Sequence, residues 1–446
     1  MTAVTAAGSL VERLGVQLHP LPGGADAREL LGLALRRNPR RAQLLVSRVL
    51  GKHIPTDPLL VRGSGLLLGG LVADVLAGRA PRELPVALLH AAVRGEPGAA
   101  RALHDGAAPP EVPPPDVLVL GYAETATALG HCVAEGLGGA DYLHSTRRPV
   151  AGYRSAGGFS EEHSHATEHL LLPADPALLR GGRPLVLVDD ELSTGRTVLN
   201  TIRALHATAP RERYVVATLV DARGTDTTLV DGVRALGARI DVVALCRAAV
   251  ELPTDIAERA TALRAEIDAH EAGPTLTGAT PTEPALVELD WPTGVPTGGR
   301  HGFRLADHTA LAASLPALAA ALADAAGMRP GERTLVLGTE ELMALPLRLA
   351  QTLADAGHDV RFSTTTRSPA VVAAVPGYAL TSGVTFPAHD DPADGPGPRY
   401  AYNVAGAWDH VLVVVDPPAD TPALRSGLIA ALAPHTARTT IVVTPS

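Results

Sequence analysis

Short runs of valine and leucine recur along this 446-residue chain, each followed by a glycine or acidic turn and then by an amphipathic segment. Continuous apolar runs are typical of strands buried on both faces, and apolar residues every three to four positions are typical of helices. Their alternation predicts an α/β fold, with a parallel sheet flanked by helices. The predicted strand–helix units are 117–137 and 185–207, followed by strands 214–223 and 239–245 and a helix 254–270.

The first hundred residues carry a different pattern. Residues 26–50 predict helical segments separated by breakers, with a helix restart at Pro39, and 63–78 predicts a further helix. That apolar stretch is too short and too interrupted to span a bilayer. The first twenty residues lack the basic and apolar pattern of a signal sequence. We therefore expect a cytoplasmic protein with no membrane contact.

A stretch rich in proline, glycine and threonine at 273–285 predicts a linker. It divides the chain into a first domain, 1–272, with an N-terminal helical extension, and a second α/β domain, 286–446. Within the second domain, a loop of proline, glycine and aspartate at 389–398 is expected to be an exposed excursion.

The two halves resemble each other. Residues 117–147 and 334–367 both run strand, glycine, Glu-containing turn, helix, glycine, strand, and then Ser-Thr-Arg or Thr-Thr-Arg. Residues 184–205 find a partner in 410–432, where Asp416 is kept but two prolines follow it and no Thr-Gly-x-Thr turn survives. A duplication explains this matched order and makes the second half a degenerate copy. The alternative is that any two strand–helix units of an alanine-rich chain look alike.

Composition narrows the class of protein. Hydrophobic residues make up 46% of the chain and charged residues 19%, which is typical of a globular protein. A net charge of −9 with no basic cluster disfavours a nucleic-acid partner, because such binding depends on neutralising phosphates. Cys132 and Cys246 form no Cys-x-x-Cys pair, so the sequence offers neither a disulfide framework nor a zinc ribbon.

The clearest chemistry lies in LVLVDDELSTGRTVLNTI, residues 185–202. Asp189 and Asp190 follow an apolar run and are expected just beyond the carboxyl end of a parallel strand, where open α/β sheets bind their ligands. The turn after them offers backbone N–H groups and hydroxyls to a phosphate at a helix N-terminus, and Gly195 lets the backbone approach it. The chain contains no Gly-x-x-x-x-Gly-Lys-Ser/Thr motif, and no Gly-x-Gly-x-x-Gly motif follows a predicted strand. A simple helix cap would account for only one of the two acids.

This stretch resembles the signature with which type I phosphoribosyltransferases bind phosphoribosyl pyrophosphate (PRPP). The resemblance assigns the ribose hydroxyls to Asp189 and Asp190, beside Glu191, and Mg²⁺ to the same pair, largely through PRPP and water. It assigns the 5-phosphate to Ser193, Thr194, Gly195, Arg196 and Thr197. It also implies a pyrophosphate loop, often with a strained peptide, and Gly121, Tyr122, Ala123 and Glu124 stand in its place. The alternative for that loop is an ordinary strand-to-helix turn with Thr125 as its N-cap.

Between the two motifs, residues 145–172 occupy the place where phosphoribosyltransferases close a mobile hood that excludes water from the reacting centre. Arg147 and Arg148 are expected to meet the pyrophosphate charge. His163, His165 and His169 are expected to contact the acceptor or transfer a proton, with a structural zinc site as the alternative. The residues expected to be catalytic are Asp189, Asp190, Arg147, His163 and His165.

The combination of segments resembles one group of these enzymes, the phosphoribosyltransferases encoded with tellurite-resistance (ter) gene clusters. The resemblance is carried by 38–55, 121–127, 145–147, 159–169 and 188–197. That group is related to orotate phosphoribosyltransferase and has a C-terminal domain named for a Thr-Arg-Ser-Pro motif, here Thr366 to Pro369. Residues 297–303 also resemble that domain.

The resemblance implies Mg²⁺-dependent transfer of ribose 5-phosphate from PRPP to an unidentified base-like acceptor, with release of pyrophosphate, in the synthesis of a nucleoside-like metabolite. It also implies a homodimer in which hood residues reach across to the partner. The alternative is a PRPP- or nucleotide-binding regulator without turnover.

The second half keeps a turn like the pyrophosphate loop and the Thr-Arg-Ser-Pro motif, but it lacks the paired carboxylates and the phosphate turn. We therefore expect it to bind the acceptor or product, or to cover the first site. The alternative is that Thr366 and Arg367 form a structural turn whose arginine pairs with a local carboxylate. The residues concerned are Gly338, Thr339, Glu340, Glu341, Thr366, Arg367 and Ser368.

Overall fold

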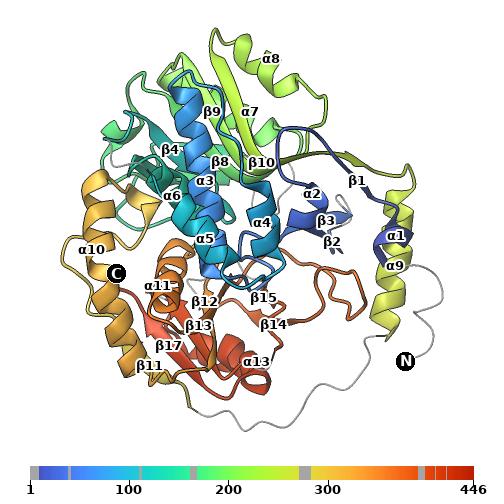
Figure 1. Cartoon of the computed structure of the whole chain (residues 1–446), viewed down its shortest axis with the longest axis vertical. Coiled ribbons are helices and arrows are strands. Elements are labelled where there is room, and N and C mark those ends of the chain that lie inside the picture. Colours follow the sequence, from blue (N-terminus) through green and yellow to red (C-terminus); the bar gives the residue numbers. More distant parts are fainter. Residues whose placement is uncertain are drawn as a thin grey trace.

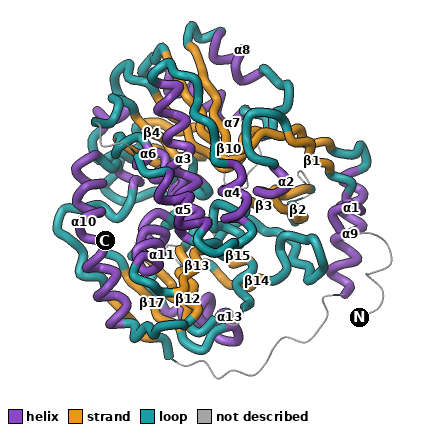
Figure 2. Tube along the Cα trace, viewed as in Figure 1, coloured by secondary structure: helices purple, strands orange, loops and turns teal. Residues whose placement is uncertain are grey.

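Two parallel sheets, one from each half of the chain, form the framework of the protein (Figure 1). The structure is a computed structural model and describes residues 10–38, 42–109, 113–160, 168–270, 283–389, 397–406, 408–417 and 419–445. Helices α8, α9 and α10 lie at the periphery of the molecule (Figure 2). This arrangement confirms the α/β fold expected from the alternation of apolar strands and amphipathic helices.

Within the described residues, the first sheet has six strands in the order β1-β10-β9-β8-β4-β5. All neighbours pair in parallel except β1, which is antiparallel to β10. The strands are β1 (Gln17–Pro20), β4 (Leu118–Gly121), β5 (Asp141–His144), β8 (Leu185–Leu192), β9 (Arg213–Asp221) and β10 (Arg239–Glu251). The helices of this half are α1 (Leu10–Leu14), α2 (Ala27–Leu30), α3 (Pro58–Leu76), α4 (Val86–Val93), α5 (Ala99–Gly106), α6 (Ala126–Gly136), η1 (Pro176–Leu179), α7 (Arg196–Thr208), α8 (Thr228–Arg234) and α9 (Ile256–His270).

The second sheet has five described strands, all parallel, in the order β11-β17-β16-β12-β13. They are β11 (Ala285–Glu288), β12 (Arg333–Gly338), β13 (Asp359–Thr364), β16 (His410–Val415) and β17 (Thr439–Val443). The helices of this half are η2 (Gly299–His301), α10 (Leu305–Ala325), α11 (Ala344–Asp355), α12 (Pro422–Leu424), η4 (Arg425–Ile429), α13 (Ala430–Leu432) and η5 (Ala433–His435).

The two halves share one topology, as the sequence repeat predicts. In the first sheet β4 lies between β5 and β8, in the second β12 lies between β13 and β16, and β5 and β13 are the edge strands. After each edge strand comes an antiparallel hairpin: β6 (Gly157–Ser160) with β7 (Glu168–Leu171), and β14 (Gly383–Pro387) with β15 (Pro398–Tyr402). Thr146 and Thr366 make corresponding bridges to these hairpins, with Leu170 and Tyr400. The second half therefore has the architecture of a copy of the first.

The prediction of helices over 26–50 is largely wrong. Only α2 is helical there, and β2 (Leu31–Leu35) and β3 (Gln43–Ser47) form an antiparallel hairpin; the proposed restart at Pro39 lies outside the described residues. Tertiary contacts decide the outcome, because the backbone of Arg36 bridges to Ala370 of the second half and Val371 donates its N–H to the Leu35 carbonyl. The linker at 273–285 and the loop at 389–398 fall mostly outside the described residues.

Helix α3 begins earlier than predicted, because Asp57 caps it by accepting a hydrogen bond from the Leu59 N–H and Pro58 occupies its first turn. By length and composition, α3 and α10 could each cross a membrane, but the apolar window of α3 is 83% buried within the protein and that of α10 is 33% buried. Helix α3 contacts α6 and also α11 of the second half. One continuous cluster of buried apolar side chains extends from the first sheet into the second, so the halves share a core.

Candidate active site

The carboxyl ends of β4 and β8 open onto a cavity of about 660 Å³. The two strands are neighbours, and their last paired residues are Gly121 and Val188. The segments that follow them both line the cavity, together with residues of the β2–β3 region and of the second half. The two predicted motifs contribute the following lining residues: Tyr122, Ala123, Glu124, Thr125, Asp189, Asp190, Glu191, Leu192, Ser193, Thr194, Gly195, Arg196, Thr197 and Val198.

Asp189 and Asp190 lie within β8, not beyond its end as predicted. Strand β8 extends further than β4, because it continues to pair with the longer strand β9. In that pairing Asp189 lies opposite Thr218. The edge of β8 that β4 leaves uncovered therefore carries both half-buried carboxylates into the cavity. An Asp189 oxygen accepts a hydrogen bond from the Asp190 N–H at 2.9 Å and one from the Thr125 hydroxyl at 3.4 Å. Thr125 makes no side-chain cap on α6, so its hydroxyl serves the aspartate instead.

The turn after β8 has the shape of an anion site. Gly195 has φ +72° and stands directly before the thirteen-residue helix α7, whose first N–H groups have no partner within the helix. A Cβ at Gly195 would lie 3.0 Å from the Leu229 Cβ, so both conformation and space favour glycine here. The positive end of the α7 dipole therefore faces the cavity at the place predicted for a phosphate.

The loop after β4 is buried and held from the β5 side. The Ala123–Glu124 peptide bond is cis. The Ala123 N–H donates to the Ser145 hydroxyl at 3.0 Å, and that oxygen lies 2.8 Å from the His169 Nδ1. The Tyr122 ring packs edge-on against Phe159 of the β6–β7 hairpin at 5.4 Å. The hairpin in the predicted hood region thus rests on the predicted pyrophosphate loop.

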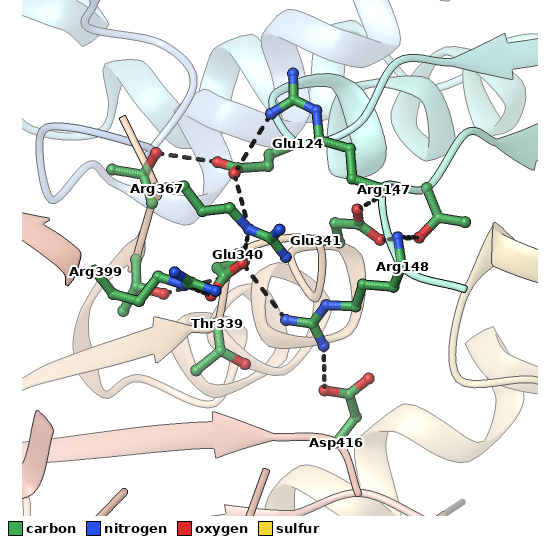
Figure 3. Close-up of polar contacts among 12 residues, drawn as sticks. Glu124, Arg147, Arg148, Thr339, Glu340, Glu341, Arg367, Arg399 and Asp416 are labelled. Atoms are coloured by element: carbon green, nitrogen blue, oxygen red, sulfur yellow. Dashed lines mark hydrogen bonds and ion pairs between the residues drawn. The ribbon is translucent and has the colours of Figure 1, made fainter. Parts of the chain in front are cut away.

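Glu124 is the electrostatic centre of this end of the cavity (Figure 3). Lys52, Arg367 and Arg147 each place a nitrogen near its carboxylate, at 3.4, 3.6 and 3.7 Å respectively. The Thr366 hydroxyl donates a hydrogen bond to it at 3.0 Å. Burial favours the neutral acid, but these cations and the threonine outweigh it and lower the pKa of the Glu124 carboxyl.

Glu340 of the second half holds a second group of arginines. Its backbone has φ +50° and its side chain is fully buried. The carboxylate pairs with Arg367, with Arg399 at 2.6 Å and with Arg148 at 3.5 Å (Figure 3). Arg148 therefore faces the second half, where it also lies 3.9 Å from Asp416, instead of the cavity. Of the predicted second-half residues, Arg367 and Ser368 line the cavity, whereas Gly338, Thr339, Glu340, Glu341 and Thr366 are not part of its lining.

Two models of known protein families match the chain. A family model described as phosphoribosyl transferase matches residues 30–249. A second, described as the TRSP domain C-terminal to that transferase, matches residues 297–432. Residues 30–249 belong to this phosphoribosyl transferase family, and the second half carries the TRSP domain that follows it. The protein is therefore a phosphoribosyltransferase, an enzyme, as the paired-aspartate motif indicates. Among curated protein sequences, none matches the chain.

Solved structures with a local likeness to this transferase include adenine phosphoribosyltransferases from Trypanosoma brucei and Giardia lamblia. The first is 12% identical over 49% of this chain and 77% of its own, with a TM-score of 0.25. The second is 20% identical over 50% and 96%, with a TM-score of 0.26. An orotate phosphoribosyltransferase from Aeropyrum pernix is 22% identical over 28% and 60%, with a TM-score of 0.18.

The histidines of the transferase's predicted hood divide into two groups. His163 and His165 lie outside the described residues. His169 is buried, lines the cavity and stacks on Phe159 with ring centroids 4.8 Å apart. Its described contacts are those of a side chain that supports the loop after β4.

Sequence reasoning missed several lining residues. Lys52 and His53, which follow the β2–β3 hairpin, line the cavity beside Arg36 and Leu44, and so does Arg399 of β15. One feature of the sequence could have pointed to Lys52: it is the only lysine among the 38 lysines and arginines of the chain. No local pattern places these residues, because their positions depend on how the hairpin and the second half pack against the first sheet.

A possible metal cluster lies away from this cavity. Among the described residues, His131, Glu135 and His308 have ligand atoms within 4.8 Å of one another. Glu135, however, pairs with Arg62 at 2.7 Å and Arg348 at 2.5 Å, and the two positive charges oppose a cation there. The cluster is better explained as an ion-pair contact between α6, α3 and α11.

Proposed function

We propose that this phosphoribosyltransferase transfers ribose 5-phosphate from PRPP to a base-like acceptor and releases pyrophosphate, in the synthesis of a nucleoside-like metabolite. The observation that carries the proposal is the convergence of three elements on one cavity: the paired carboxylates of β8, the Gly195 turn and the buried loop 121–124. Each matches a different part of PRPP in charge and hydrogen-bonding capacity.

The first two parts of the donor are recognised by β8 and the segment after it. Asp189 and Asp190 accept hydrogen bonds from the vicinal ribose hydroxyls, since ionised carboxylates are acceptors only. The hydroxyls and N–H groups of Ser193 to Thr197 hold the 5-phosphate at the start of α7. With both ends of the sugar fixed, the anomeric carbon is held in a constant position for attack.

The pyrophosphate lies at the cationic end, near Glu124 and Arg147. Positive groups there stabilise the charge that develops on the leaving group as its bond to the anomeric carbon breaks. The hood hairpin limits access of water, which would otherwise compete with the acceptor for the electrophilic sugar.

The residues present also fit Mg²⁺. Two neighbouring carboxylates supply hard oxygen ligands, and Mg²⁺ is usually held by one or two carboxylates together with substrate phosphates and water. Asp189 and Asp190 would hold it, and the ion would neutralise charge on the pyrophosphate.

The rest of the cavity lining suits the acceptor. It includes apolar and aromatic side chains, Leu44, Leu45, Tyr122 and Tyr400, and the imidazole of His53. A flat ring with a nucleophilic nitrogen suits such a lining.

The proposal is tested by titration calorimetry of PRPP, with and without Mg²⁺, into the wild-type chain and the Asp189→Asn/Asp190→Asn variant. We expect Mg²⁺-dependent binding to be lost in the variant and kept in a control with Asp231→Asn and Asp255→Asn, two exposed positions outside the cavity, in α8 and directly before α9. Absence of PRPP binding by the wild type would contradict the proposal. If the wild type binds PRPP, pyrophosphate release is measured with a panel of bases. Release with any base shows turnover, and its absence with all of them favours a regulatory protein that only binds PRPP.

A further inference from the structure

The cations around Glu124 come from three distant parts of the chain. Arg147 follows β5 in the first half, Lys52 follows the β2–β3 hairpin, and Arg367 belongs to the second half. Arg399 and Arg148 pair with the second carboxylate, Glu340. Basic groups therefore outnumber the two carboxylates that they surround, which favours an anionic ligand at this end of the cavity.

Lys52 is an unusual residue in an unusual place. It is the only lysine among 38 basic residues, and its side chain is 7% exposed although lysines are among the least buried residue types. A lysine contributes a compact charge on a flexible stem, whereas arginine brings a wide planar fork. The cavity thus has the compact charge of a lysine beside Glu124, although all 37 other Lys or Arg positions of the chain are arginines.

The second half sets the position of Lys52. The Lys52 carbonyl accepts a hydrogen bond from the Ser363 hydroxyl of β13 at 3.4 Å. Thr56 and Phe362 exchange backbone hydrogen bonds at 2.9 and 2.8 Å. Gly51 packs so closely on Phe362 that a Cβ would lie 2.5 Å from its ring. The segment that carries the lysine is therefore fastened to the second sheet.

The second half also supplies Arg367 directly. Glu340 pairs with Arg367 and so holds it, while the adjacent Thr366 donates to Glu124. Figure 3 shows Arg367 between the two carboxylates, reaching from the second half toward the first. Arg367, Ser368 and Arg399 line the same cavity as Asp189 and Asp190.

We propose that Lys52 and Arg367 bind the pyrophosphate group of PRPP, so that the C-terminal half completes the transferase site instead of forming a separate one. The inference rests on the proposed function, because it assigns part of the PRPP site. Thr366 is a positioning residue, which orients Glu124 between the two cations.

The test uses three probes, PRPP, inorganic pyrophosphate and ribose 5-phosphate, each with Mg²⁺, on the full chain. Because the protein has one lysine, incorporation of lysine labelled with ¹³C at the ε-carbon gives one lysine NMR signal. We expect PRPP and pyrophosphate to shift it and ribose 5-phosphate to leave it in place.

The matched variants are Arg367→Gln and Arg300→Gln. Arg300 is a partly buried arginine that contacts Glu341 at 3.6 Å and Asp416 at 3.5 Å within the second half, and it lies outside the cavity. In calorimetry, Arg367→Gln should lower the affinity for PRPP and for pyrophosphate by about tenfold or more, because a charge-assisted hydrogen bond to the ligand is lost. It should change ribose 5-phosphate affinity less than about twofold, which also shows that the variant is folded. Arg300→Gln should bind all three probes as the wild type does.

The outcomes separate the two proposals. If PRPP binds in a manner that depends on Asp189 and Asp190, yet the lysine signal stays in place and Arg367→Gln binds pyrophosphate normally, the inference is overturned and the proposed function stands. If the wild type binds neither PRPP nor pyrophosphate, both fall.

Discussion

The Thr366 hydroxyl of the second half donates a hydrogen bond to the buried Glu124 carboxylate of the first, at 3.0 Å. The converse contact also exists, because Thr146 of the first half donates to Glu341 of the second at 2.6 Å. Glu124 and Glu341 each stand three residues after the glycine that ends β4 or β12, and Thr146 and Thr366 follow the edge strands β5 and β13. The two halves therefore meet through residues at corresponding positions of their shared topology.

This reciprocal pairing predicts strong coupling between Thr366 and Glu124. Removing a hydrogen bond to a buried charge costs about 1.5–3 kcal/mol, so Thr366→Val should lower the free energy of unfolding by that amount. In a double-mutant cycle with Glu124→Gln, measured by urea denaturation, the coupling energy should exceed about 1 kcal/mol. Thr146→Val with Glu341→Gln is the matched cycle for the other contact. Additive effects in both cycles would show that the contacts do not join the halves.

Replacing Gly195 should disturb both the fold and the 5-phosphate site. Gly195→Ala places a side chain at φ +72° and against Leu229, so we expect unfolding to become easier by about 1–2 kcal/mol and ribose 5-phosphate to bind more weakly. Gly237→Ala is the control, because Gly237 has φ +78° with open space around it and lies outside the cavity. Gly237→Ala should also lower the free energy of unfolding, because alanine is strained at this backbone conformation, but it should not lower the affinity for ribose 5-phosphate. Calorimetry of ribose 5-phosphate with both variants checks this, and equal affinities would contradict it.

Acid should weaken the contact between the halves. Burial favours a neutral Glu341, but Arg300, Arg148, His144 and the Arg147 N–H outweigh it and lower the pKa of the Glu341 carboxyl from 4.5 to about 2. Since the folded-state pKa lies below the unfolded one, the stabilisation is complete above about pH 4.5 and is lost as the pH falls from there toward 2. The difference corresponds to on the order of 3 kcal/mol.

Urea denaturation of the wild type and Glu341→Gln at a series of pH values measures this contribution. The gap between their unfolding free energies should narrow steadily as the pH drops below about 4.5. The exposed Glu288→Gln serves as control and should show no comparable narrowing. A gap that does not vary with pH would mean that the Glu341 charge does not stabilise the fold.

Removal of Mg²⁺ should affect PRPP and ribose 5-phosphate differently. We expect chelation to weaken PRPP binding strongly, because the ion offsets the pyrophosphate charge next to two aspartates, and to change ribose 5-phosphate affinity little. Calorimetry of both probes with and without chelator gives the comparison. Equal sensitivity of the two ligands would place the metal elsewhere.

Sequence reasoning reached the parts of the site that are local in the chain. The apolar run before Asp189, the glycine before α7 and the strand before Glu124 each have a short pattern with one physical meaning, and all three elements were placed in the right order. It failed at 31–47, where leucine-rich residues fit a helix or a strand equally well and pairing with the second half selected the strand. It also misplaced the end of β8, because the length of that strand depends on its neighbour β9.

By itself the sequence determined the α/β class, the repeated order of elements and the position of the glycine turn before α7, since these depend on periodicity and on residue types a few positions apart. Only the tertiary structure decided which residues surround Glu124. Lys52, Arg147 and Arg367 are separated by up to 315 positions in the chain, and their approach depends on the packing of two sheets around a shared core. A charge cluster of that kind has no local signature, because burial and counter-charges exist only once the halves are in contact.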